Sequence, residues 1–186
     1  MWLAHALTLS RIPLAIAIAW TWGRPVWSVV LVLIAALTDT ADGRVARRAR
    51  RRGASGPDIG GWLDPMVDKL FVAVVLATVW VRQALPHRAL VIALVGAREL
   101  VLVPLIAIYL ARGRPHDPLH ADRFGKLATI AQFIALCVIA LAPDDALPPA
   151  AAAGVLGLVA AGHYVIAAAA AERRRIATAG RDTPRA

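Results

Sequence analysis

The chain has 186 residues, of which 59% are hydrophobic and only 18% charged, and its mean hydropathy is +0.63. This apolar share exceeds that of soluble domains, so the composition predicts a single-domain integral membrane protein. A net charge of +9 would point to nucleic acid in a soluble protein. Here membrane topology explains the charge, and no nucleic-acid partner is expected.

Six apolar segments predict six transmembrane helices. A hydrocarbon core of roughly 30 Å requires about 20 residues for each helical crossing. Separators rich in Pro, Gly and charged residues divide the segments, which in chain order cover residues 8–22, 27–46, 60–81, 88–111, 124–142 and 149–171. We therefore expect an all-α integral membrane domain over residues 1–172, followed by a basic cytoplasmic tail at residues 173–186.

Basic residues are distributed unevenly between the two sides of this topology. Only Arg24, Arg82 and Arg88 lie beside the first and third loops. The second loop, the fourth loop and the tail carry Arg44, Arg47, Arg48, Arg50, Arg51, Arg52, Arg112, Arg114, Arg123, Lys126, Arg173, Arg174, Arg175, Arg181 and Arg185. By the positive-inside rule both termini are expected in the cytoplasm, with the chain crossing the cytoplasmic membrane repeatedly and the lipid bilayer as its partner.

Four aspartates occupy the hairpin of the second and third expected helices. Asp39 and Asp42 lie on one arm, and Asp64 and Asp68 lie on the other. Residues three or four apart share a helix face, so each pair forms a stripe. At about 1.5 Å per residue, Asp39 sits about 12 Å inward from the basic cluster that begins at Arg47. The carboxylates are therefore expected in the cytoplasmic half of the membrane.

Carboxylates in this position need compensation. Each ionised residue facing lipid would cost at least about 2.5 to 3.5 kcal/mol, and clustered anions repel one another. Divalent cations that prefer oxygen ligands, such as Mg²⁺, Mn²⁺ or Ca²⁺, relieve both effects. The sequence thus predicts a polar metal site, of the kind that holds a pyrophosphate while an oxygen nucleophile attacks phosphorus. A small divalent-cation transporter is the alternative class, although the chain lacks the inverted repeats typical of transporters.

The residues around these carboxylates form a recognisable pattern. Small residues such as Gly43 and Gly60 leave room either for a ligand or simply for close helix packing. The whole pattern resembles the signature of the CDP-alcohol phosphotransferase family, a family with six transmembrane helices: Asp39-x-x-Asp42-Gly43-x-x-Ala46-Arg47, then Gly60-x-x-x-Asp64-x-x-x-Asp68. One departure is the spacer at residues 48–59, which is longer than is usual in the family.

The resemblance implies a role for each matching residue. Asp39, Asp42, Asp64 and Asp68 would hold two divalent ions, Mg²⁺ or Mn²⁺, and Asp68 would also act as general base. The CDP-lipid would be bordered by Gly43, Arg47 and Gly60, with Thr8 as a further candidate from the stretch ALTLSR. The reaction implied is attack by an alcohol on the lipid-side phosphorus of CDP-diacylglycerol with release of CMP. The resemblance also implies a homodimer.

Further motifs bear on the acceptor alcohol. The stretch DPMVDK at residues 64–69, the pair Arg98-Glu99 and the motif Gly125-Lys126-x-x-Thr129-x-x-Gln132 are similar to bacterial phosphatidylglycerophosphate synthases. This similarity implies glycerol 3-phosphate, with Arg98 and Lys126 meeting its phosphate. A cardiolipin synthase and an inositol-phosphate-accepting member remain alternatives. Two other roles also remain open: Arg98 could form a salt bridge to another helix, and Lys126 could serve only as a positive charge beside a membrane span. Glu99 is expected to point away from Arg98.

Overall fold

The computed structural model describes residues 2–51, 60–111 and 123–179, and these residues are almost entirely helical. This confirms the all-α expectation for the part of the chain described. The elements in order are α1 (Trp2–Thr21), α2 (Pro25–Arg51), α3 (Gly60–Arg82), α4 (Arg88–Val95), α5 (Ala97–Ala111), α6 (Arg123–Leu141), the 3-10 turn η1 (Pro143–Asp145) and α7 (Leu147–Ala179).

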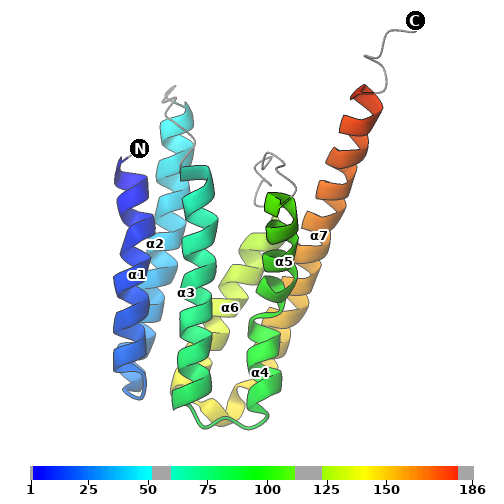
Figure 1. Cartoon of the computed structure of the whole chain (residues 1–186). Helices are drawn as coiled ribbons and strands as arrows, with labels where there is room; N and C mark the ends of the chain where they lie inside the picture. Colours follow the sequence, from blue (N-terminus) through cyan, green and yellow to red (C-terminus); the bar gives the residue numbers. More distant parts are fainter. Residues whose placement is uncertain (1, 52–59, 112–122, 180–186) are drawn as a thin grey trace, which may run out of the picture.

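The helices run alternately in opposite directions along one bundle (Figure 1). Helices α4 and α5 follow one another in the same general direction and together make one passage along it. Helix α1 packs against both α2 and α3, α2 packs against α6, and α7 packs against α4, α5 and α6. The start of α1, the end of α2, the start of α3 and the end of α7 all lie at the same end of the bundle. We call this the carboxylate end, because Asp39, Asp42, Asp64 and Asp68 lie on the halves of α2 and α3 nearest to it.

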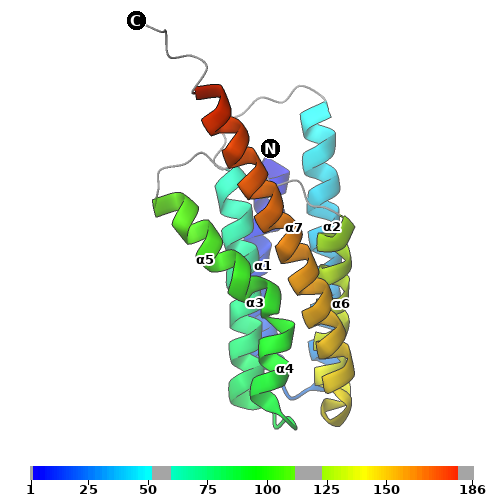
Figure 2. The ribbon, with the colours of Figure 1, turned by 90° about the vertical axis from the view of Figure 1, so that its right-hand side faces the viewer.

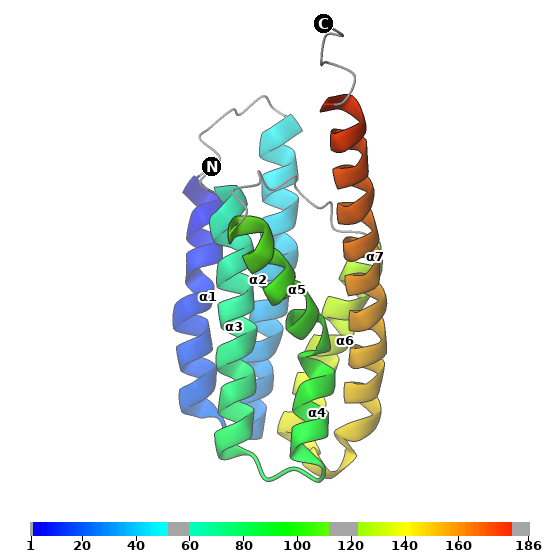
Figure 3. The same ribbon diagram turned by 45° about the vertical axis from the view of Figure 1, so that its right-hand side comes forward.

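The fourth expected helix, residues 88–111, is broken in the structure. Helices α4 and α5 meet at an angle of 55°, and the change of direction is visible in Figures 2 and 3. The break falls at Gly96, whose N–H still donates to the carbonyl of Ile92 at 2.9 Å. Glycine is a poor helix former and a frequent point of bending. The expectation of one continuous helix here was wrong.

The outer surface of the bundle is apolar, which is typical of a membrane protein. Large side chains such as Trp20, Leu37 and Ile166 are exposed, and a water-soluble monomer rarely exposes so much apolar surface. Among the described residues, the helices long and apolar enough to cross a membrane are Phe124–Leu141 and Leu147–Ala170, together with the bent pair Arg88–Val95 and Ala97–Ile108 if it counts as one span. Two shorter apolar helices cover Leu9–Thr21 and Pro25–Thr38. Six spans therefore remain a prediction.

The core lies where the helices meet, around fully buried side chains such as Ile18, Val75 and Leu136. Helix α7 comes very close to α5 at Gly157. A Cβ atom added to this glycine would lie 3.2 Å from the Cβ of Arg98 and 3.4 Å from its backbone nitrogen. Because glycine allows such an approach in membranes, α7 packs directly on the first turn of α5. This contact fixes the position of Arg98.

Candidate active site

The two helices that carry the four aspartates are joined through α1. Helix α1 packs against α2 on one side and against α3 on the other, and all three reach the carboxylate end (Figure 1). Of the four side chains, only that of Asp68 is described. The side chains of Asp39, Asp42 and Asp64 lie outside the described residues, as do those of the CDP-lipid candidates Thr8, Gly43, Arg47 and Gly60. Among the side chains that are described, no group of three or more metal-ligating residues occurs.

Asp68 is paired with Arg11 of α1. The Arg11 side chain is 6% exposed, and its Nη1 faces Oδ1 of Asp68. That oxygen is buried, whereas the Asp68 side chain as a whole is 44% exposed. The ion pair satisfies a guanidinium that interrupts an apolar helix, where an unpaired charge would be costly. One edge of the Asp68 carboxylate is therefore held by the protein, while the rest of the group stays accessible.

A second polar cluster links α5 to α6. The Nη1 of Arg98 donates to Oγ1 of Thr129 at 2.8 Å and to the carbonyl of Gly125 at 3.4 Å. The Nε2 of Gln132 donates to Oε2 of Glu99 at 3.1 Å and to the carbonyl of Val95 at 3.0 Å. The carbonyl of Val95 is available for this bond because the helix breaks at the next residue. The cluster thus joins the start of α5 to two turns of α6.

Glu99 and Arg98 are neighbours in sequence and are also bound to each other. The Nε and Nη2 of Arg98 lie 3.1 and 3.0 Å from Oε1 of Glu99. The expectation that Glu99 points away from Arg98 was wrong, because the long, flexible Arg98 side chain reaches the carboxylate of its neighbour. Glu99 is only 12% exposed. Its place in that first turn is favourable for an anion, since helix N-termini carry partial positive charge.

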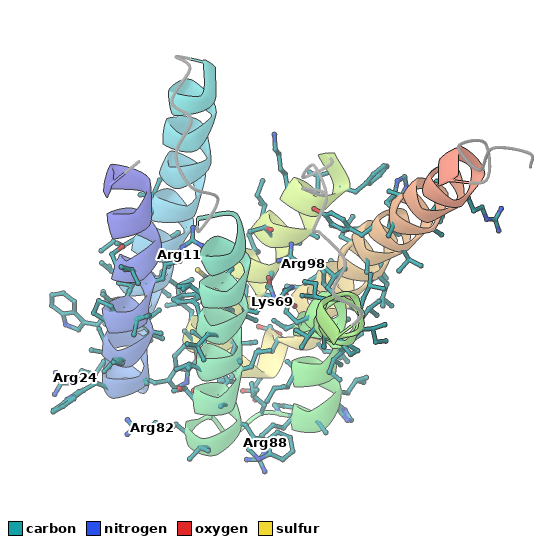
Figure 4. The ribbon with its side chains drawn as sticks, turned by 45° about the horizontal axis from the view of Figure 1, so that its top comes forward. Arg11, Arg24, Lys69, Arg82, Arg88 and Arg98 are labelled. Carbon is teal, nitrogen blue, oxygen red and sulfur yellow. The ribbon has the colours of Figure 1, made fainter. Side chains whose placement is uncertain are left out.

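Lys69 of α3 lies on the side of that helix nearest to this cluster. Its ammonium group lies in the field of both Glu99, which attracts it, and Arg98, which repels it. Figure 4 shows Lys69 and Arg98 on one side of α3 and Arg11 on the other. Asp68 and Lys69 are therefore neighbours on α3 whose side chains point to different parts of the bundle. Asp68 faces α1, and Lys69 faces α5. The sequence motif contained Lys69, but its position on the side of α3 that faces Arg98 could only be found from the folded structure.

Lys126 does not join the cluster, although it follows Gly125 directly. It is exposed near the start of α6. The structure therefore joins Arg98 and Glu99 to Gly125, Thr129 and Gln132. Of the motif DPMVDK, Lys69 lies on the same side of α3 as this cluster, while Lys126 is exposed. The assignment of Lys126 to an acceptor phosphate stays a prediction.

Comparison of the chain with models of known protein families shows which family it belongs to. The family model for CDP-alcohol phosphatidyltransferases matches residues 1–169 of the chain. Since this covers nearly the whole protein, the chain belongs to the CDP-alcohol phosphatidyltransferase family and is an enzyme of that class. The family resemblance read from the aspartate pattern is confirmed.

Several individual relatives carry names that specify a particular reaction. The chain is 30% identical to a CDP-diacylglycerol–glycerol-3-phosphate 3-phosphatidyltransferase of Arabidopsis thaliana, over 82% of this chain and 70% of the relative. It is 29% identical to the enzyme of the same name from Sodalis glossinidius, over 71% of this chain and 69% of the relative. A cardiolipin synthase (CMP-forming) of Streptomyces coelicolor is 29% identical over 55% of this chain and 44% of the relative. No solved structure matches the chain significantly.

Proposed function

We propose that the protein transfers the phosphatidyl group of CDP-diacylglycerol to glycerol 3-phosphate, forming phosphatidylglycerophosphate and releasing CMP. The observation that carries this proposal is the family match over residues 1–169 together with relatives named for this reaction at about 30% identity. The hydroxyl oxygen of the acceptor forms a bond to the lipid-side phosphorus, and the bond between that phosphorus and CMP breaks. The hydroxyl proton goes to a base.

We assign the base to Asp68. Its carboxylate is partly exposed and is oriented by Arg11, so the group is held while one side can accept a proton. A positioned base contributes about 10² to 10⁴ in rate. Asp39, Asp42, Asp64 and Asp68 together offer oxygen ligands that suit Mg²⁺ or Mn²⁺. When bound, such ions neutralise charge on the pyrophosphate.

The remaining assignments, of the substrate-binding residues, the topology and the oligomeric state, follow the sequence motifs and the family resemblance. Gly43, Arg47, Gly60 and Thr8 are proposed to border the CDP-lipid, and the positive charges of Arg98 and Lys126 are proposed to attract the acceptor phosphate. The carboxylate end would face the cytoplasm, where the polar acceptor is dissolved, in a cytoplasmic membrane crossed six times. The family resemblance further supports a homodimer. The divalent-cation transporter considered from the sequence gains no support from the comparisons.

An acceptor panel tests the proposed reaction. Purified protein is given CDP-diacylglycerol and either glycerol 3-phosphate, phosphatidylglycerol, inositol phosphate or no acceptor, and CMP release is measured. We expect release with glycerol 3-phosphate to exceed the acceptor-free rate at least about tenfold, because a site built to bind a polar group discriminates strongly against its absence. Equal rates with and without glycerol 3-phosphate would refute the proposed acceptor.

Cardiolipin synthesis is the second candidate, and the Streptomyces coelicolor relative favours it. In that reaction phosphatidylglycerol replaces glycerol 3-phosphate as the alcohol. The same panel decides between the two. A rate that rises with phosphatidylglycerol but not with glycerol 3-phosphate would support the second candidate.

A further inference from the structure

We propose that Lys69 is the residue that binds the anionic group of the acceptor, and that Arg98 and Glu99 serve to position it. This inference rests on the proposed function, because it concerns how glycerol 3-phosphate is held. It differs from the sequence-based assignment, in which Arg98 and Lys126 make the phosphate contacts. In the structure, Arg98 and Lys69 differ in the contacts that their side-chain nitrogen atoms already make.

Arg98 is occupied by the protein itself. All three of its side-chain nitrogens have partners: Nε and Nη2 contact Glu99, and Nη1 donates to Thr129 and Gly125. A guanidinium carries five N–H groups in a fixed plane, so contacts on all three nitrogens leave little capacity for a ligand. Its side chain is 21% exposed and is pressed against α7 at Gly157. Arg98 therefore contributes charge and rigidity, while its hydrogen bonds stay within the protein.

Lys69 is in the opposite situation. Its ammonium group carries three N–H donors, and within the described part of the chain no hydrogen bond or ion pair to that group occurs. It is nevertheless half-buried and lies in the field of Glu99 and Arg98. Cations inside a membrane protein are costly when unpaired, and they mark ligand sites. Lys69 is thus a cation with donors available for a ligand.

The charges of the cluster also favour an anion. Lys69 and Arg98 are positive and only Glu99 is negative, so these three residues together carry one excess positive charge. Gln132 and Thr129 satisfy Glu99 and Arg98 without adding charge. A phosphate monoester beside Lys69 would neutralise the excess and receive charge-assisted hydrogen bonds, which are stronger than neutral ones.

The position of Lys69 next to the proposed base makes this arrangement useful. Adjacent residues of a helix differ by about 1.5 Å in height and point in different directions. Asp68 faces α1 and Lys69 faces α5 (Figure 4). An acceptor phosphate at Lys69 therefore lies at nearly the same height along α3 as the proposed base.

The test is a comparison of Lys69→Met with a matched control. Full-length protein in lipid vesicles is assayed for CMP release as glycerol 3-phosphate is varied. Lys69→Met is expected to raise the KM for glycerol 3-phosphate about 10- to 100-fold, the loss expected for a charge-assisted hydrogen bond. The kcat and the KM for CDP-diacylglycerol are expected to stay near wild-type values, and Lys69→Arg is expected to restore much of the affinity. Arg82→Met, which removes an exposed cation at the other end of α3, should leave all three constants unchanged.

A measurement on the unaltered protein removes any dependence on how the variants fold. Glycerol 3-phosphate is expected to protect Lys69 from an amine-modifying reagent, with the modified residue located by mass spectrometry. An unchanged KM in Lys69→Met, or modification of Lys69 that glycerol 3-phosphate does not slow, would overturn the role of Lys69 while leaving the proposed reaction intact. A KM effect confined to Lys126→Met would also overturn it. Loss of acceptor-dependent CMP release in the wild type would overturn both proposals.

Discussion

The variant Asp68→Asn is expected to lose CMP release by about 10² to 10⁴-fold, the range that a positioned general base contributes. An asparagine amide has nearly the same shape as the carboxylate but cannot accept the proton of the acceptor hydroxyl. Its oxygen can still accept a hydrogen bond from Arg11, so the contact between α1 and α3 is largely preserved. The measurement is the initial rate of CMP release from CDP-diacylglycerol at saturating glycerol 3-phosphate.

Asp144→Asn provides the matched control for this change. Asp144 is exposed in η1, at the far end of the bundle from the four aspartates. The same chemical substitution there should leave the rate unchanged and the protein equally well folded. If Asp68→Asn turned over at close to the wild-type rate, Asp68 would not be the base.

The variant Glu99→Leu is expected to destabilise the protein more than any other change in the polar cluster. Removing this carboxylate takes away the acceptor of Nε and Nη2 of Arg98 and one of the two acceptors of the Gln132 amide in the interior of the bundle. Breaking a buried ion pair from one side costs about 3 to 5 kcal/mol. For a chain of this size such a loss corresponds to a fall on the order of 10 °C in melting temperature. The measurement is thermal unfolding of the purified protein in detergent.

The double variant Arg98→Leu with Glu99→Leu separates this effect from simple loss of packing. Replacing both members of a buried pair by apolar residues is often close to neutral, because no charge is left unpaired. The double variant should therefore melt at a higher temperature than Glu99→Leu alone. If the two changes instead added their costs, the cluster would not be held together by the pairing of Arg98 with Glu99.

The general architecture could be predicted from the sequence because apolar segments and their separators are local signals. The expected segments coincide with α1, α2, α3, α6 and α7 to within several residues. The break at Gly96 was missed, since a single glycine in a long apolar run is a weak signal by itself. Helix α7 also continues to Ala179, beyond its expected apolar end at residue 171. Its extension is rich in Arg and Ala, which favour helix even where they are too polar for a membrane.

The site could be predicted only in part, because sequence motifs name residues without showing their partners. The aspartate pattern proposed Asp68 as a site residue, which stays a prediction. The presence of Arg98 inside an apolar segment correctly indicated that it needs a partner. The partner proved to be Glu99, which spacing rules had excluded because they describe short side chains better than the flexible Arg98. The pairing of Arg11 with Asp68 and the position of Lys69 on the side of α3 nearest Arg98 depend on tertiary packing. In each case the available signal was a charge within an apolar helix.

The most direct test of the proposed reaction follows the oxygen atom of the acceptor hydroxyl. Purified protein is incubated with CDP-diacylglycerol and glycerol 3-phosphate that carries oxygen-18 in its 1-hydroxyl group, and the lipid and nucleotide products are analysed by mass spectrometry. Phosphatidylglycerophosphate containing the label, together with unlabelled CMP, is the predicted result, because the hydroxyl oxygen forms the new bond to phosphorus. Release of CMP with phosphatidic acid as the lipid product, or a lipid product without the label, would contradict the proposed transfer.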